Sequence, residues 1–253
     1  MRVAILAPWN LLQYSALSNY HLTLLHLYKI KEYKEFYLER ARQGDFITLD
    51  NGANEGVDID DADLVDAAIE YEVSEVVAPD QPRDGEESTE RTLAFLSQYK
   101  PTLVARNILT MGCPHGQSRR QWLHNVRLIA PLVTTLGVSK KVEEIDHGDL
   151  QRPELVELVI DMSPKIHLLG ADSTYWWIKR YDHWYNQLRG VRSVDTQKLV
   201  AAGLQDVPLD QMTTKAEVGS FDLSRAALVP TEHQDDIIRN NIRTYMEWAN
   251  ASS

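Results

Sequence analysis

Short runs of β-branched and other apolar residues recur along the chain at intervals of roughly 25 to 35 residues, and turn residues and a segment of helical periodicity follow each run. The runs expected to form strands are RVAILA at 2–7, FITLD at 46–50, EVVAPD at 75–80, TLVARN at 102–107, LVTTLG at 132–137, KIHLLG at 165–170 and VRSVD at 191–195. The amphipathic segments expected to form helices are 18–43, 61–72, 86–99, 118–130, 152–162 and 173–189. The pattern predicts an alternation of strands and helices.

This alternation favours parallel strands joined by right-handed crossovers, in either a (β/α) barrel or a doubly wound open sheet. Neither GxGxxG nor GxxxxGK[ST] occurs, which weakens the case for a nucleotide-binding open sheet. No low-complexity linker divides 1–253, so we expect a single domain. Residues 204–231 are irregular, with breakers at Pro208 and Pro230, and 232–250 predicts a closing helix.

Composition and net charge limit where the protein is expected to be found and what it is expected to bind. The chain has no run of about 18 consecutive apolar residues, and Pro8 interrupts the apolar N-terminus, so we expect a cytoplasmic protein without membrane contact. The net charge of −11 argues against a protein that binds nucleic acid with its whole surface, because phosphate binding depends on clustered lysine and arginine. Local basic clusters exist, and each is more typical of a solvated helix face than of a binding site. Their members are Arg119, Arg120 and Arg127, and then Lys179, Arg180, Arg189 and Arg192.

Polar or small residues stand where several of the predicted strands end. In a parallel barrel the carboxyl ends of the strands and the loops after them form the active face, so these positions are candidates for function. They are Asp50, Asp80, Asn107, Gly137, Gly170 and Asp195. An aspartate at such a position can also cap a helix or form an Asx turn, the interpretation that Asp80 taken alone favours. For Asp50 and Asp195 we favour catalysis.

Two carboxylates that face one pocket suit chemistry at an anomeric carbon, where one attacks and the other carries a proton. The nucleophile has to stay ionised, whereas the proton carrier benefits from a pKa raised toward neutrality by burial or by a neighbouring charge. His115 and Gly116, in the loop MGCPHGQS, add a hydrogen-bonding side chain and a close backbone approach on the same face. Gly137 and Gly170 would let a planar ligand lie against the backbone, although turn geometry also explains both.

The cysteine and histidine content indicates whether the chain has the residues for a zinc site. Cys113 is the single cysteine of the chain, which excludes an intramolecular disulfide and a zinc site built from several cysteines. Scattered histidines such as His115 and His124 give no closed tetrahedral set. We therefore expect a protein that needs no metal.

Four segments resemble, in their order along the chain, the motifs of one enzyme family. LDNGANEG at 49–56 is similar to an Asp-Ser-Gly-Gly segment, and VVAPDQPRDGEESTERTLAFL at 76–96 is similar to a base-recognition aspartate followed by a helix. PKIHLLGADSTYWW at 164–177 resembles Pro-His-Tyr-Leu-Met-Gly-Val-Gly, and GVRSVDTQ at 190–197 resembles Gly-(Ile/Val)-Asp-Met-Phe-Asp. These motifs belong to the tRNA-guanine transglycosylase superfamily. The chain is most similar to its bacteriophage and bacterial members that insert 7-deazaguanines into DNA.

The resemblance implies a (β/α)8 barrel of the TIM type and assigns roles to residues. It makes Asp195 the nucleophile, Asp50 the acid and base, and Asp80 the carboxylate that reads the base. It also implies contacts with the substrate at Asn51, His115, Gly116, Gly137, Leu169 and Gly170. The implied reaction replaces guanine with a 7-deazaguanine such as preQ0 through a covalent aspartyl-glycosyl intermediate, with no cofactor.

The chain also departs from the family. The zinc-binding subdomain Cys-x-Cys-x-x-Cys plus His is missing, the chain is shorter than the tRNA enzymes, and Asn51 and Ala53 replace the serine and a glycine of the early motif. These departures favour DNA over tRNA as the substrate.

Three alternatives stay open. The first is a transglycosylase acting on tRNA, and the second is a retaining hydrolase that uses the same two carboxylates on a soluble sugar or nucleoside. The third is a catalytically silent barrel that only binds a nucleic acid or a partner. A partner protein or a second copy of this chain would be one source of further nucleic-acid-binding surface.

Overall fold

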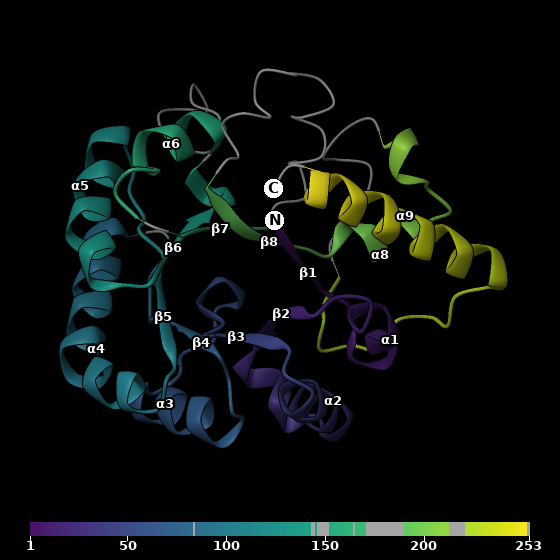
Figure 1. Cartoon of the computed structure of the whole chain (residues 1–253), viewed down its shortest axis with the longest axis horizontal. Coiled ribbons are helices and arrows are strands. Elements are labelled where there is room, and N and C mark those ends of the chain that lie inside the picture. Colours follow the sequence, from purple (N-terminus) through teal and green to yellow (C-terminus); the bar gives the residue numbers. More distant parts are fainter. Residues whose placement is uncertain are drawn as a thin grey trace.

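The computed structural model describes residues 1–82, 84–142, 145, 152–163, 165–170, 190–212 and 221–251. Within them, eight parallel strands form one sheet in the order β1-β8-β7-β6-β5-β4-β3-β2, and the helices lie around its outside (Figure 1). The sheet is a nearly closed barrel, so the predicted (β/α)8 fold of the TIM type is confirmed.

The strands and helices have the following bounds. The strands are β1 (Arg2–Ile5), β2 (Tyr20–Leu24), β3 (Phe46–Asp50), β4 (Glu75–Val77), β5 (Leu109–Gly112), β6 (Thr135–Ser139), β7 (Ile166–Leu169) and β8 (Val191–Thr196). The α-helices are α1 (Leu12–Ser15), α2 (Lys31–Arg42), α3 (Asp61–Glu70), α4 (Gly85–Ala105), α5 (Arg119–Ile129), α6 (Arg152–Val159), α8 (Lys198–Gly203) and α9 (Glu232–Ala251). None of the described helices is long and apolar enough to cross a membrane.

Side chains close the seam between β1 and β2, where no backbone ladder joins the described strands. Ser18 donates its hydroxyl to the carbonyl of Val3 at 2.6 Å and accepts from the amide of Tyr20 at 3.1 Å. Ser15 donates to the carbonyl of Ile5 at 2.7 Å. Because an unpaired buried polar group costs about 1–3 kcal/mol, these serines stabilise the join that completes the barrel.

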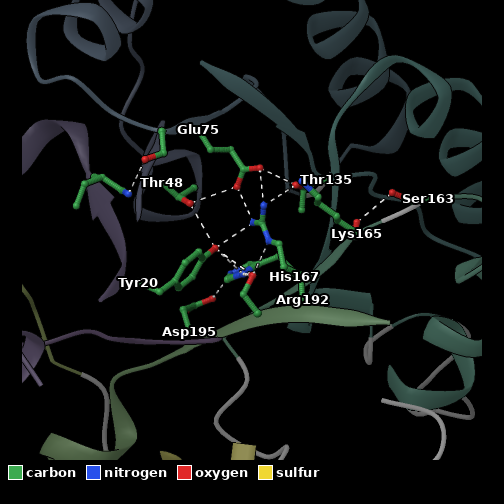
Figure 2. Close-up of polar contacts among 12 residues, drawn as sticks. Tyr20, Thr48, Glu75, Thr135, Ser163, Lys165, His167, Arg192 and Asp195 are labelled. Atoms are coloured by element: carbon green, nitrogen blue, oxygen red, sulfur yellow. Dashed lines mark hydrogen bonds and ion pairs between the residues drawn. The ribbon is translucent and has the colours of Figure 1, made fainter. Parts of the chain in front are cut away.

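Apolar side chains fill the space between the strands and the helices. One buried cluster packs β1, β6, β7 and β8 against α5, α6, α8 and α9, and a second packs β2, β3 and β4 against α2, α3 and α4. Inside the barrel, small apolar clusters lie beside a polar centre. The polar residues Tyr20, Thr48, Glu75, Thr135, His167, Arg192 and Ser193 form one hydrogen-bonded network (Figure 2).

Arg192 belongs to this interior, so its assignment to a surface basic cluster is wrong. The pairing of β7 with β8 is irregular, because Ile166 pairs with Val191 and His167 pairs with Ser193. Arg192 is the extra residue of this bulge, and a bulge re-aims a side chain that regular alternation would send outward. The guanidinium pairs with Glu75 at 2.7 Å inside the barrel.

The predicted helix at 18–43 contains an eighth strand that the sequence pattern missed. The segment forms β2, the 3-10 turn η2 (Leu25–Lys29) and then α2. Every residue of β2 is buried. A strand buried on both faces shows no alternation of polar and apolar residues, so periodicity does not separate it from the helical segment that follows.

The predicted strand at 102–107 is wrong. Residues 102–105 are the last turn of α4, in which Leu103 is fully buried while Val104 is 60% exposed, and Asn107 then turns the chain with a φ of 59°. The strand is β5, which begins two positions later at Leu109. Asn107 therefore lies at the amino end of β5, away from the active face, and its interpretation as a functional strand end is also wrong.

The other predicted helices are present in the structure, although α4 extends to Ala105, six residues beyond the predicted end at 99. Segments 61–72, 86–99, 118–130 and 152–162 correspond to α3, α4, α5 and α6. The closing helix predicted at 232–250 is α9, which packs on α8 where Gly203 meets Ile238. The predicted helix at 173–189, with Lys179, Arg180 and Arg189, lies outside the described residues.

Candidate functional site

A cavity of about 110 Å³ lies at the carboxyl ends of the strands, the face on which barrel enzymes carry their active sites. Asp50 from the end of β3, Asp80 from the loop after β4 and Asp195 from β8 all line it. The structure thus brings the three predicted acids to one place. Leu6, Leu22, Val77, Cys113 and Leu169 supply apolar parts of the lining.

Asp195 is held firmly at the cavity edge. Its side chain is 6% exposed, and its Oδ1 accepts hydrogen bonds from His167 Nε2 at 3.0 Å and from the amide of Gly170 at 2.9 Å. Gly170 has a φ of 63°, a left-handed conformation that glycine adopts without strain, and this turn aims its amide at the carboxylate. The predicted nucleophile therefore has a fixed orientation.

Asp50 is held by a turn and has a different environment. Its Oδ1 accepts from the amide of Gly52 at 2.8 Å, so the Asx turn considered for strand-end acids is present here alongside the exposure to the cavity. Burial raises the pKa of Asp50 to about 8, and the negative charges of Glu55, Asp80 and Asp195 add to the rise. Asp50 therefore carries a proton at neutral pH.

Asp80 lies between two donors. Asn51 Nδ2 donates to Oδ1 at 3.0 Å, and His115 Nε2 lies 2.7 Å from Oδ2. Asp80 does not cap the following helix, because Asp84 accepts from the first amides of α4. The helix-cap interpretation of Asp80 is wrong, and Asp80 lines the cavity instead.

The remaining predicted contact residues divide into two groups. His115, Leu169 and Gly170 line the cavity. The others do not: Asn51 lines a neighbouring cavity with Asp80, Gly116 lines another with His115, and Gly137 lies beneath the lining. A Cβ on Gly137 would come within 2.5 Å of the sulfur of Cys113, and one on Gly116 within 2.7 Å of the amide of Trp122. Close packing therefore explains both glycines.

Comparison with known proteins shows the fold alone. No protein-family model matches the chain, and no curated protein matches it. The structure is similar to that of the YdjI aldolase from Escherichia coli K12, with a TM-score of 0.54 and 12% sequence identity, over 92% of this chain and 80% of that one. An acid-lined cavity at the mouth of a TIM barrel is nevertheless an enzyme-like arrangement.

His167 and Lys140 are two residues of the site that were not predicted from the sequence. His167 contacts Asp195 from within β7, and Lys140, directly after β6, lines the cavity. The signal for His167 was present, because a histidine inside the apolar run KIHLLG needs a buried partner. Lys140 directly follows the end of β6 at Ser139, whereas the sequence pattern placed that end two residues earlier, at Gly137.

We expect the protein to work without a metal. Within the described residues no group of three or more histidine, cysteine, aspartate or glutamate side chains is arranged to hold a metal ion. His115 is engaged with Asp80, and His124 is exposed on α5. Elemental analysis of the purified protein should find no stoichiometric zinc, and chelation should leave activity unchanged. Bound zinc together with loss of activity on chelation would contradict this expectation.

Proposed function

We propose that the protein is a transglycosylase that replaces guanine in DNA with a 7-deazaguanine, through a glycosyl ester on Asp195. The observation that carries the proposal is the different environment of two acids in one cavity. Asp195 accepts two hydrogen bonds, as a carboxylate does, whereas the raised pKa of Asp50 keeps it protonated at neutral pH. A nucleophile and a proton donor in one cavity are the groups that glycosyl transfer requires.

The reaction begins with extrusion of a guanosine residue, because its glycosidic bond is inaccessible within a duplex. Asp195 attacks C1′, the bond from C1′ to N9 breaks, and Asp50 gives its proton to the departing guanine. The incoming 7-deazaguanine then gives its N9 proton to the Asp50 carboxylate. Its N9 attacks C1′ and releases Asp195, so both acids return to their starting states and no cofactor is consumed.

The cavity offers recognition for a base that both half-reactions share. Guanine and the 7-deazaguanines present the same N1–H and 2-amino donors, and each carboxylate oxygen of Asp80 has a second lone pair beyond the ones that Asn51 and His115 use. Leu169 supplies an apolar surface for the base. One pocket therefore serves the leaving base and its replacement.

Contact with the polynucleotide has to be local because the chain is acidic. A second cavity, lined by Gly116, Gln117 and Lys141, adjoins the first through His115 and Pro82, which line both. This adjoining surface is where we place the strand that leads to the extruded base.

The test is incubation of the protein with a labelled 7-deazaguanine such as preQ0 and, in parallel, single-stranded DNA, double-stranded DNA and tRNA. Incorporation into DNA with release of an equal amount of guanine supports the proposal. Incorporation into tRNA alone would reverse the choice of substrate and keep the chemistry. Release of base without incorporation would identify a hydrolase, and neither event would indicate a barrel that only binds.

Replacing Asp80 with asparagine should weaken binding of guanine and preQ0 by roughly tenfold to a hundredfold, because a mismatch of buried hydrogen-bonding groups costs about 1–3 kcal/mol. The new amide turns a donor toward Asn51, His115 or the base, and all three are donors themselves. Titration calorimetry with each base measures the effect. Asp63→Asn, on the exposed face of α3, is the matched control. Unchanged affinity in Asp80→Asn would remove Asp80 from the pocket.

A further inference from the structure

We propose that His167 is a positioning residue that orients Asp195 so that only one carboxylate oxygen faces the substrate. The proposal rests on the proposed role of Asp195 as the nucleophile, and it adds a residue to which neither the sequence motifs nor the proposed chemistry gives a function. It is carried by the hydrogen bonds that meet at the two residues and by the network that continues from His167 to Arg192 and Glu75 (Figure 2).

Both hydrogen bonds to the Asp195 carboxylate end on the same oxygen. His167 and the amide of Gly170 donate to Oδ1, and in the described part of the chain nothing donates to Oδ2. Two donors from different directions fix the plane of the carboxyl group. Oδ2 is therefore the oxygen available for attack on C1′, and its lone pairs have one direction relative to the cavity.

The partners of His167 fix which ring nitrogen carries the proton. Nδ1 lies 2.8 Å from Ser193 Oγ and 3.2 Å from Tyr20 Oη. Arg192 donates Nε–H to Ser193 Oγ at 3.1 Å and Nη2–H to Tyr20 Oη at 3.1 Å, and Ser193 donates its own proton to Tyr20 Oη at 3.1 Å. Tyr20 therefore accepts from both neighbours and has its own proton to give to Nδ1. Nδ1 is the acceptor in this arrangement, and Nε2 keeps the proton that it donates to Asp195.

An ion pair at the centre of the barrel holds this arrangement in place. Arg192 donates to both oxygens of Glu75, at 2.9 and 2.7 Å, and Thr135 and Thr48 complete the hydrogen bonds of that carboxylate. Glu75 is fully buried. Burial also raises the pKa of Tyr20, which keeps its phenol protonated. Because a buried ion pair contributes little net stability, orientation of the groups above it is the better explanation for its presence.

A neutral donor suits this task. The negative charge of Asp195 has to move into the bond with C1′, and a cation paired directly with the carboxylate would oppose that movement by stabilising the ground state. The amide of Gly170 and a neutral imidazole orient the carboxylate and stabilise its ground state less than a cation would. In the glycosyl ester Oδ1 becomes the carbonyl oxygen, which still accepts both hydrogen bonds.

The test compares His167→Leu, which removes the donor, with His167→Gln, whose amide nitrogen is able to take the place of Nε2. The single-turnover rate of adduct formation and the affinity for preQ0 are measured for each variant. His167→Leu should slow adduct formation by about 10- to 100-fold, the cost of a small displacement of a reacting atom, and should leave preQ0 affinity unchanged. His167→Gln should restore most of the rate. His124→Leu and His124→Gln, at an exposed histidine of α5, are matched controls.

Two results would overturn the proposal. One is a normal rate of adduct formation in His167→Leu, and the other is an equal loss of rate and base affinity that His167→Gln does not rescue, which a merely structural role predicts. If the wild type forms no adduct, the proposed function is wrong, and the role of His167 in that reaction is wrong as well. A measurement without substrate separates the two questions. Nitrogen-15 NMR of labelled histidine at pH 7 should show the proton of His167 on Nε2, and a proton on Nδ1 would contradict the arrangement whatever the reaction.

Discussion

Replacing Asp195 with asparagine should abolish the covalent adduct and lower base exchange by about 10⁴-fold or more, as loss of a nucleophile does in other covalent enzymes. The substitution is nearly isosteric. The amide oxygen of the variant takes the position of Oδ1, because His167 and the amide of Gly170 both need an acceptor there. The amide nitrogen then replaces Oδ2 at the cavity, where it has no lone pair free to attack C1′. The site keeps its shape and loses its nucleophile.

A denaturing gel of each variant with labelled DNA or RNA measures this effect. Asp63→Asn makes the same chemical change on the exposed face of α3 and should form as much adduct as the wild type. Thermal unfolding should be alike for the three proteins. An adduct or near-normal exchange with Asp195→Asn would show that the nucleophile lies elsewhere and that VRSVDTQ does not correspond to the nucleophile segment.

The part of the fold that sequence predicted is the part with clear periodicity. Helices with one polar face, such as α3 and α5, and strands bounded by turn residues, such as β3, were placed within a few positions. β2 was missed because a strand with both faces buried has the composition of a buried helix. The end of α4 was mistaken for a strand because Thr102 to Val104 is rich in β-branched residues, yet tertiary packing keeps it helical.

Sequence predicts those residues of the site whose location follows from their position at the end of a strand. Asp50 and Asp195 come at carboxyl ends of parallel strands, and all such ends meet at one mouth. The contact of Asn51 with Asp80 depends instead on how neighbouring loops pack. The inward turn of Arg192 depends on a bulge that no local pattern announces.

Replacing Asp50 with asparagine should slow adduct formation by roughly two to four orders of magnitude without preventing it, because general acid catalysis contributes about that much. The Asn side chain keeps an oxygen that accepts from the amide of Gly52, so the turn after β3 stays in place. Asp195 also keeps its attacking oxygen. The variant should form adduct slowly, and a substrate with a better leaving base should recover part of the rate, because such a base depends less on a proton.

The pH dependence of the same variant separates a proton donor from a residue that only shapes the cavity. The pKa of Asp50 is about 8, so adduct formation by the wild type should fall as the pH rises through that value, whereas Asp50→Asn should show no such fall.

The stability of the wild type should fall over the same direction of pH change. The folded pKa lies above the ordinary value of 3.8, so the folded chain holds a proton that the unfolded chain has lost. The resulting contribution to stability is complete below 3.8 and is lost as the pH rises through about 8. Asp50→Asn never carries a buried charge. Its melting temperature relative to that of the wild type should therefore rise as the pH increases over that interval. A wild type whose rate and relative stability stay level from pH 4 to pH 9 would mean that Asp50 is ionised throughout and that another group protonates the departing base.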